Sequence, residues 1–204
     1  MHTHSQTVLI LGDSISAAYG LEIEHGWVSL AQQHIQQRQL SFNIINQSIS
    51  GETSYGGLSR IESLLQQYQP TFVLIELGAN DALHGVPTEV IQDNLRELIL
   101  RSQQAGAETL VLGIHTANSY GETYRTSFCH IYQQLADEMG VALVPSILQE
   151  VINAGGMLQD DGLHPNLAAQ TLVSDKICRQ LIPLLEKSSS TLATHSCTLN
   201  RSLS

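Results

Sequence analysis

The sequence has little positive charge and few cysteines. Nine of its 204 residues are Lys or Arg, against 19 Asp and Glu; the formal net charge is −10, and no two basic residues are adjacent. Such a surface repels phosphate backbones and anionic headgroups, so we expect neither nucleic acid nor an anionic membrane as a partner. The 3 cysteines are far apart and in no Cys-x-x-Cys pair, which indicates neither a disulfide framework nor a zinc site.

Long apolar runs are also missing near the start of the chain. The first residues, Met1 to Gln6, are polar and lead into an apolar run too short for a signal peptide or a membrane span. We therefore expect a soluble chain without stable membrane insertion. We expect it to be periplasmic or secreted if a leader has been removed, and cytoplasmic otherwise.

The composition favours one packed domain. Hydrophobic residues make up 42% of the chain and charged residues 14%, and a domain of about 100 to 200 residues can bury a full core. From Lys187 onward the sequence is rich in Ser and Thr and has no apolar periodicity. We predict a single domain over residues 1–186 and a disordered tail over residues 187–204.

Five short apolar runs alternate with segments of helical periodicity. The runs are rich in β-branched and aliphatic residues, a pattern typical of strands buried on both faces of a parallel sheet. Right-handed crossovers then place helices on both faces. We predict an α/β fold with three layers (α/β/α) and a flavodoxin-like, five-stranded parallel sheet in the order 2-1-3-4-5. The predicted strands cover residues 7–11, 41–46, 71–77, 109–114 and 141–144, and the predicted helices cover residues 26–37, 57–68, 87–105, 123–139 and 166–185.

Polar clusters fall at the ends of these strands. In open parallel sheets, ligands bind outside the carboxyl ends of the strands, where the strand order reverses. The clusters cover residues 12–16, 50–51, 78–81 and 161–164. We expect them to converge on one cleft.

The last cluster holds a candidate general base. Asp161 stands three residues ahead of His164, in a turn that contains Gly162 and Pro165. A carboxylate that contacts one imidazole nitrogen fixes the tautomer and leaves the other nitrogen free to accept a proton. What this stretch lacks is a nucleophile.

Ser14 is the candidate nucleophile. It follows the first predicted strand, and its hydroxyl becomes reactive if His164 lies within hydrogen-bonding distance. The alternative is that Ser14 only caps a helix. The Gly-x-Ser-x-Gly elbow is missing because residue 16 is Ser, which argues against an α/β-hydrolase. The backbone N–H groups of Ser14 and Gly51 and the amide of Asn80 could stabilise an oxyanion, although Gly51 and Asn80 could equally be ordinary turn residues.

Four blocks in order resemble those of the SGNH hydrolases, the GDSL esterase/lipase superfamily. They are Gly12-Asp13-Ser14, Gly51, Gly78-x-Asn80-Asp81 and Asp161-x-x-His164-Pro165, and they span most of the chain. Residues 9–14, 48–54, 76–78 and 159–166 are similar to the branch of bacterial multifunctional thioesterases, lysophospholipases and arylesterases. Two departures stand out. Ile15 replaces the Leu of the family name, and residues 115–121 read His-Thr-Ala-Asn-Ser-Tyr-Gly where that branch is expected to have Pro-Ala-Asn-Tyr-Gly.

The resemblance implies a serine esterase. Ser14 would attack the acyl carbonyl, His164 would act as base and then as acid, and Asp161 would orient His164. The N–H groups of Ser14 and Gly51 and Nδ2 of Asn80 would form the oxyanion hole. We expect no cofactor and no metal, and a monomer that hydrolyses small acyl esters or thioesters, such as aryl esters, acyl-CoA-type thioesters and lysophospholipids. Further candidates for substrate contact are Asp13, which could instead brace the turn, Leu83, His84, His115 and Tyr120, with apolar cover from Ile147, Leu148, Val151, Ile152, Met157 and Leu158.

Three alternatives stay open. A carbohydrate acetylesterase of the same superfamily would use the same residues. A metallophosphoesterase could hold two metals at Asp13, Asn80-Asp81 and His164, although an Asp-x-His pair and a Gly-x-His-x-His motif are missing from the sequence. A non-catalytic, flavodoxin-like binding module would need Ser14 only as a cap.

Overall fold

A five-stranded parallel sheet forms the middle layer of the molecule. The computed structural model describes residues 5–115 and 121–199, with residues 192–199 described by their backbone alone. The sheet has the order β2-β1-β3-β4-β5, which confirms the predicted class and strand order. Its strands are β1 (Gln6–Gly12), β2 (Phe42–Asn46), β3 (Phe72–Glu76), β4 (Glu108–Leu112) and β5 (Ala142–Val144).

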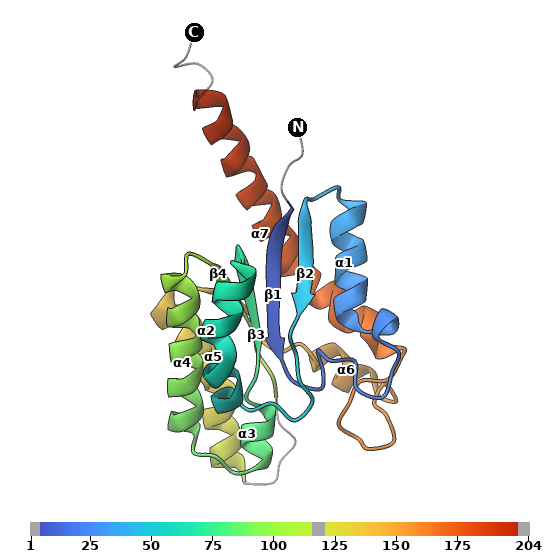
Figure 1. Cartoon of the computed structure of the whole chain (residues 1–204). Coiled ribbons are helices and arrows are strands. Elements are labelled where there is room, and N and C mark those ends of the chain that lie inside the picture. The colour runs from blue at the N-terminus through green and yellow to red at the C-terminus, as the bar shows by residue number, and fades with distance from the viewer. Residues whose placement is uncertain (1–4, 116–120, 200–204) are drawn as a thin grey trace.

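Helices cover both faces of the sheet, as predicted (Figure 1). One face carries α1 (Trp27–Gln37) and α7 (Ala169–Leu199), and the other carries α2 (Ser54–Tyr68), α4 (Thr88–Gln104) and α5 (Glu122–Met139). The short helices α3 (Ala79–Leu83) and α6 (Gln149–Ala154) lie at the end of the molecule towards which β1 and β2 point. These two helices and the 3-10 helix η1 (Ile23–His25) were not predicted, because segments this short carry no helical periodicity.

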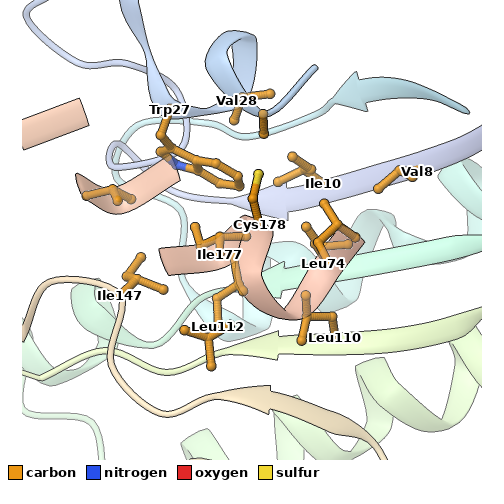
Figure 2. Packing of buried hydrophobic residues seen from close by; sticks show 14 of the residues in the cluster. Val8, Ile10, Trp27, Val28, Leu74, Leu110, Leu112, Ile147, Ile177 and Cys178 are labelled. Carbon is orange, nitrogen blue, oxygen red and sulfur yellow. The ribbon is translucent and has the colours of Figure 1, made fainter. Parts of the chain in front are cut away.

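The alternation of side chains along β1 explains its continuous apolar run. Val8 and Ile10 point to the face covered by α1 and α7, whereas Leu9 and Leu11 point to the opposite face, and all four are fully buried. Figure 2 shows the first of these cores, where Trp27 of α1 lies over the sheet beside residues of α7. Burying one such aliphatic side chain contributes about 1.5–3 kcal/mol to stability. The two cores therefore hold β1 inside the sheet, between β2 and β3.

Helix α2 begins earlier than predicted because of its cap. The hydroxyl of Thr53 accepts a hydrogen bond from the backbone N–H of Gly56 at 3.1 Å, so the helix starts at Ser54. Gly57 lies inside the helix, where an added Cβ would come within 2.5 Å of a methyl of Leu77. This glycine lets α2 approach the sheet closely.

Helix α7 is longer than predicted. It passes through Pro183 and continues to Leu199, so the end predicted near Leu185 is wrong. The hydroxyls of Ser189, Ser190 and Thr191 each donate a hydrogen bond to the carbonyl four residues earlier in the helix. These bonds give the polar side chains partners within the helix itself. In Figure 1, this part of α7 projects past the sheet at the end opposite α3. The single-domain boundary at residue 186 and the disorder of residues 187–204 stay predictions.

Candidate active site

The reversal of strand order places the polar clusters around one cleft. The chain passes from β1 outward to β2 and then crosses to β3, so the loops after β1 and β3 diverge at their carboxyl ends. Ser14 follows β1, Gly51 follows β2 and Asn80 follows β3. The loop between α6 and α7 brings His164 to the same edge, and the predicted convergence is observed.

Ser14, His164 and Asp161 form a continuous hydrogen-bonded chain. The Ser14 Oγ lies 2.7 Å from Nε2 of His164, and Nδ1 of His164 lies 2.6 Å from Oδ2 of Asp161. The other oxygen of Asp161 accepts the backbone N–H groups of Leu163 and of His164 itself, at 2.9 and 3.1 Å. The three-residue spacing read from the sequence thus orients the acid and the imidazole together.

These bonds keep Asp161 ionised. The hydrogen bond from the His164 ring lowers the pKa of the Asp161 carboxyl most, the backbone N–H of Leu163 lowers it further, and the pKa reaches about 2. A carboxylate on Nδ1 requires the proton of a neutral imidazole to sit on Nδ1. Nε2 is then the free lone pair, directed at the Ser14 hydroxyl.

The turn that carries Ser14 is built by Asp13. Oδ1 of Asp13 accepts the backbone N–H of Ile15 at 3.0 Å, and the carbonyl of Asp13 accepts the N–H of Ala17. Residues 14–20 form turns, and the first α-helix begins only at Trp27. Ser14 therefore caps no helix, so the capping alternative is wrong, whereas Asp13 does brace the turn.

The two further donors predicted for an oxyanion, at Gly51 and Asn80, belong to residues that line the same cavity as Ser14. Gly51 has a φ of +82°, a conformation that favours glycine, and an added Cβ would meet no heavy atom within 4 Å. Nδ2 of Asn80 donates to the carbonyl of Glu52 at 2.9 Å and to Oδ2 of Asp13 at 3.2 Å. The longer of these two bonds is the one that an oxyanion would displace more easily.

Acid-centred contacts hold the loops that supply these donors. Asp81 accepts the backbone N–H of Ser54 at 2.8 Å and its hydroxyl at 2.5 Å, which ties α3 to the start of α2. Glu52 accepts Nε of Arg60 at 2.7 Å, and the same guanidinium donates to the carbonyl of Gln47. These contacts of Arg60 hold both ends of the segment 47–52, which contains Gly51.

A cavity of about 280 Å³ opens beside Ser14. Among the residues predicted to contact substrate, Asp13, Leu83 and His115 line it. His84 does not line it; it is exposed at the C-terminal end of α3. Tyr120 lies outside the described residues. So do residues 116–119, which belong to the segment 115–121 that departs from the family pattern.

The apolar part of the cavity differs from the predicted set. Of the six predicted cover residues, Leu148 lines the cavity, whereas Ile147 and Val151 are buried in the core beneath α7. Met157 and Leu158 pack against that same core, and Ile152 is half exposed away from the cavity. The apolar lining includes Leu83 and Leu148, which were predicted, and Ile15, Ile114 and Leu163, which were not.

Tyr19 is a site residue that the sequence analysis missed. Its ring lies 4.4 Å from the His164 ring, centroid to centroid, with an interplanar angle of 34°, and it lines the cavity. Tyr19 belongs to the long turn after β1 and is about half exposed. Nothing in its sequence position signals this contact, because Tyr19 and His164 meet only in the tertiary structure.

His115 contributes a neutral imidazole to the cavity wall. Burial lowers the pKa of His115, and the charge of Lys176 lowers it further. Its Nδ1 is buried and has no hydrogen-bond partner in the described part of the chain.

Over the described ranges, no group of three or more His, Cys, Asp or Glu side chains is arranged to hold a metal ion. Asp81, which the metallophosphoesterase alternative needs as a ligand, accepts hydrogen bonds from Ser54 instead.

Among the helices of the described residues, none is long and apolar enough to cross a membrane.

Comparison with known proteins agrees with this geometry. Residues 10–172 match the GDSL-like lipase/acylhydrolase family. Esterase TesA of Pseudomonas aeruginosa is 42% identical over 181 residues, which cover 89% of this chain and 90% of that protein. Thioesterase 1/protease 1/lysophospholipase L1 of Escherichia coli is 40% identical over 185 residues, which cover 91% and 88%. The structure of psychrotrophic esterase EstA from Pseudoalteromonas sp., inhibited by monoethylphosphonate, is similar with a TM-score of 0.84 at 42% identity, covering 89% of this chain and 99% of that one. The chain belongs to the GDSL-like lipase/acylhydrolase family.

Proposed function

We propose that this enzyme hydrolyses carboxylic ester and thioester bonds of acyl substrates through a covalent acyl-enzyme on Ser14. The observation that carries the proposal is the 2.7 Å contact between Ser14 Oγ and His164 Nε2, continued to Asp161, beside a cavity with apolar walls. Family membership supports an ester hydrolase over a metallophosphoesterase or a non-catalytic module.

The mechanism follows from the proton positions. Nε2 of His164 accepts the hydroxyl proton while Ser14 Oγ forms a bond to the acyl carbonyl carbon. The imidazolium then donates that proton to the leaving alcohol or thiol as the ester or thioester bond breaks. A water molecule repeats the sequence on the acyl-enzyme, with His164 again the base, and releases the acid and free Ser14. Asp161 stays ionised throughout and stabilises the imidazolium.

The tetrahedral intermediate of each step carries a negative oxygen. We assign its stabilisation to the backbone N–H groups of Ser14 and Gly51 and to Nδ2 of Asn80, which would give up its 3.2 Å bond to Asp13 for the oxyanion. Donors of this kind act strongly because their positions are set before the charge develops. The shorter bond of Asn80 to Glu52 keeps the amide oriented during the exchange.

The cavity walls support acyl chains as the group that is bound. Five of the lining residues are Ile or Leu, and His115 is the only wall histidine other than His164 among the described lining residues. An acetylated sugar presents hydroxyl groups that need several polar partners, so the apolar walls favour acyl esters over carbohydrate acetates. Aryl esters, acyl-CoA-type thioesters and lysophospholipids remain the proposed substrate classes.

Labelling with a fluorophosphonate tests the nucleophile. The reagent is expected to modify Ser14 in the wild-type protein and to leave Ser14→Ala unlabelled, with kcat for p-nitrophenyl esters lowered about 10⁴-fold or more in that variant. Ser59→Ala is the matched control, because Ser59 is exposed on α2 and donates only to a backbone carbonyl. Near-normal hydrolysis by Ser14→Ala would refute the mechanism.

A panel of p-nitrophenyl esters from acetyl to palmitoyl, run beside the matching acyl-CoA thioesters, ranks the proposed substrates. The apolar walls are expected to give a kcat/KM that rises with chain length until the cavity is filled. A preference for acetylated sugars over every acyl ester in the panel would contradict the assignment of substrate class.

A further inference from the structure

Two buried acids lie beneath the turn that carries Ser14. Glu76, the last residue of β3, is 0% exposed, and Asp13 is 1% exposed. Oε2 of Glu76 accepts the hydroxyl of Ser16 at 2.7 Å and the backbone N–H of Asp13 at 3.3 Å. Glu76 thus binds the residues on both sides of the nucleophile in the sequence.

The second oxygen of Glu76 is unpaired with any donor. Oε1 is fully buried and has no hydrogen-bond partner within the described ranges of the chain. An ionised carboxylate buried with one oxygen unsatisfied costs far more than a neutral carboxyl group. Because Oε2 already accepts two hydrogen bonds, the proton of a neutral Glu76 belongs on Oε1.

Asp13 is the acceptor available to that proton. The side chains of Glu76 and Asp13 interact directly, and burial raises the pKa of both acids: Asp13 to about 6, and Glu76 well above its usual range. Asp81, His164 and Tyr132 are the other ionisable groups that face the pair. Two carboxyl groups in contact without a cation between them are most stable when they share one proton.

Gly12 shows that the space around Glu76 is built for this carboxyl group. Gly12 pairs with Glu76 in the register of β1 and β3. An added Cβ at Gly12 would come within 2.9 Å of Glu76 Oε2 and of the Cβ and Oγ of Ser16. The first glycine of the Gly-Asp-Ser block therefore makes room for Glu76 rather than for a substrate.

We propose that Glu76 is a positioning residue, which stays protonated on Oε1 and donates that proton to the Asp13 carboxylate, so that the turn of Ser14 is fixed. The effect extends to Asn80, since the same Asp13 carboxylate accepts from Nδ2 of Asn80. A neutral Glu76 is thus linked through one ionised Asp13 to the nucleophile and to an oxyanion donor. The inference rests on the proposed role of Ser14.

Infrared spectroscopy in D2O at neutral pH tests the protonation directly. A protonated carboxyl group gives a carbonyl band separate from those of carboxylates. We expect such a band in the wild-type protein and in Glu62→Gln, a control at an exposed acid of α2, and its loss in Glu76→Gln. A spectrum without a band that depends on Glu76 would overturn the proposal, whatever the activity of Ser14→Ala.

Kinetics test the positioning. Gln offers an acceptor oxygen and an NH2 group that can donate, so Glu76→Gln is expected to keep kcat within about threefold of the wild type. Glu76→Leu offers neither and is expected to lower kcat roughly tenfold to a hundredfold while KM changes little. Wild-type kcat in Glu76→Leu, or a kcat in Glu76→Gln as low as in Glu76→Leu, would overturn the role.

The pH dependence of stability gives a readout that does not depend on turnover or on Glu76→Leu folding. A folded-state pKa raised above the ordinary 4.5 makes the wild-type free energy of unfolding fall as pH rises from 4.5 towards that raised pKa. Glu76→Gln should fall less steeply over the same range. Equal slopes would count against a protonated Glu76. Failure of Ser14→Ala to lose activity, with the band and the slopes as expected, would overturn the proposed nucleophile and support the shared proton.

Discussion

Replacing Gly78 with Ala should cost more stability than a turn glycine normally does. Gly78 has φ +120° and ψ −21°, a conformation that L-residues rarely adopt, and it precedes α3. An added Cβ would lie 2.6 Å from the hydroxyl of Tyr132, which is buried and donates to the carbonyl of Leu77 at 2.9 Å. The substitution therefore strains the backbone and also pushes on a buried hydrogen bond.

The two costs can be added from their usual sizes. Backbone strain of this kind costs about 1–3 kcal/mol. Losing the bond from Tyr132 to the Leu77 carbonyl costs about 1 kcal/mol more. Gly78→Ala is expected to lower the free energy of unfolding by about 2–4 kcal/mol in total.

Urea unfolding of three variants separates these effects. Gly106→Ala is the control for strain alone, because Gly106 has φ +85° and an added Cβ there would meet no heavy atom within 4 Å. Tyr132→Phe removes the hydroxyl, so Gly78→Ala combined with Tyr132→Phe should lose about 1 kcal/mol less than the sum of the single losses. Equal losses for Gly78→Ala and Gly106→Ala, or additive losses in the double variant, would refute the reasoning.

Three further predictions concern His164 and Asp161. Tyr19→Ala should lower kcat severalfold, because it removes the ring whose centroid lies 4.4 Å from that of the His164 ring. Tyr19→Phe keeps the ring and should keep the wild-type kcat. An equal fall of kcat in both variants would mean that the hydroxyl matters rather than the ring. Asp161→Asn should lower kcat by about 10³–10⁴, measured with p-nitrophenyl esters, because an amide neither holds Nδ1–H in place nor stabilises the imidazolium. The pKa of Asp161 is lowered to about 2, so the stability it adds is present above the ordinary value of 3.8 and is lost as pH falls through 2. The difference in melting temperature between wild type and Asp161→Asn should therefore shrink only in that acid range, and a difference that shrinks near neutral pH would contradict the assignment.

Features that depend on neighbouring residues could be predicted from the sequence. The apolar run of residues 7–11 predicts a strand buried on both faces, because side chains alternate along any strand. The three-residue spacing of Asp161 and His164 predicts their contact, because a turn of that length brings both side chains to one side. The polar clusters at strand ends share one edge because parallel strands all end there.

Ser14 illustrates what the sequence left open. A serine after a strand can cap a helix or present a nucleophile, and both are compatible with the residues around it. The turns over residues 14–20 and the contact with His164, 150 residues away, distinguish them. That contact depends on where the loop before α7 lies against β1, which no local pattern specifies.

The sequence by itself determined the class of sheet, its strands and the residues that could react. Which side chains surround those residues depends on the tertiary structure. Tyr19 packs against His164, and Glu76 is buried under the turn of Ser14. Ile147 and Val151 lie in the core rather than at the cavity. Local propensity and periodicity are properties of neighbouring residues, whereas burial and charge coupling arise between segments far apart in the chain. An acid at the end of a strand is an ordinary residue in the sequence, and it becomes a neutral, buried partner of Asp13 only when β1 and β3 pair.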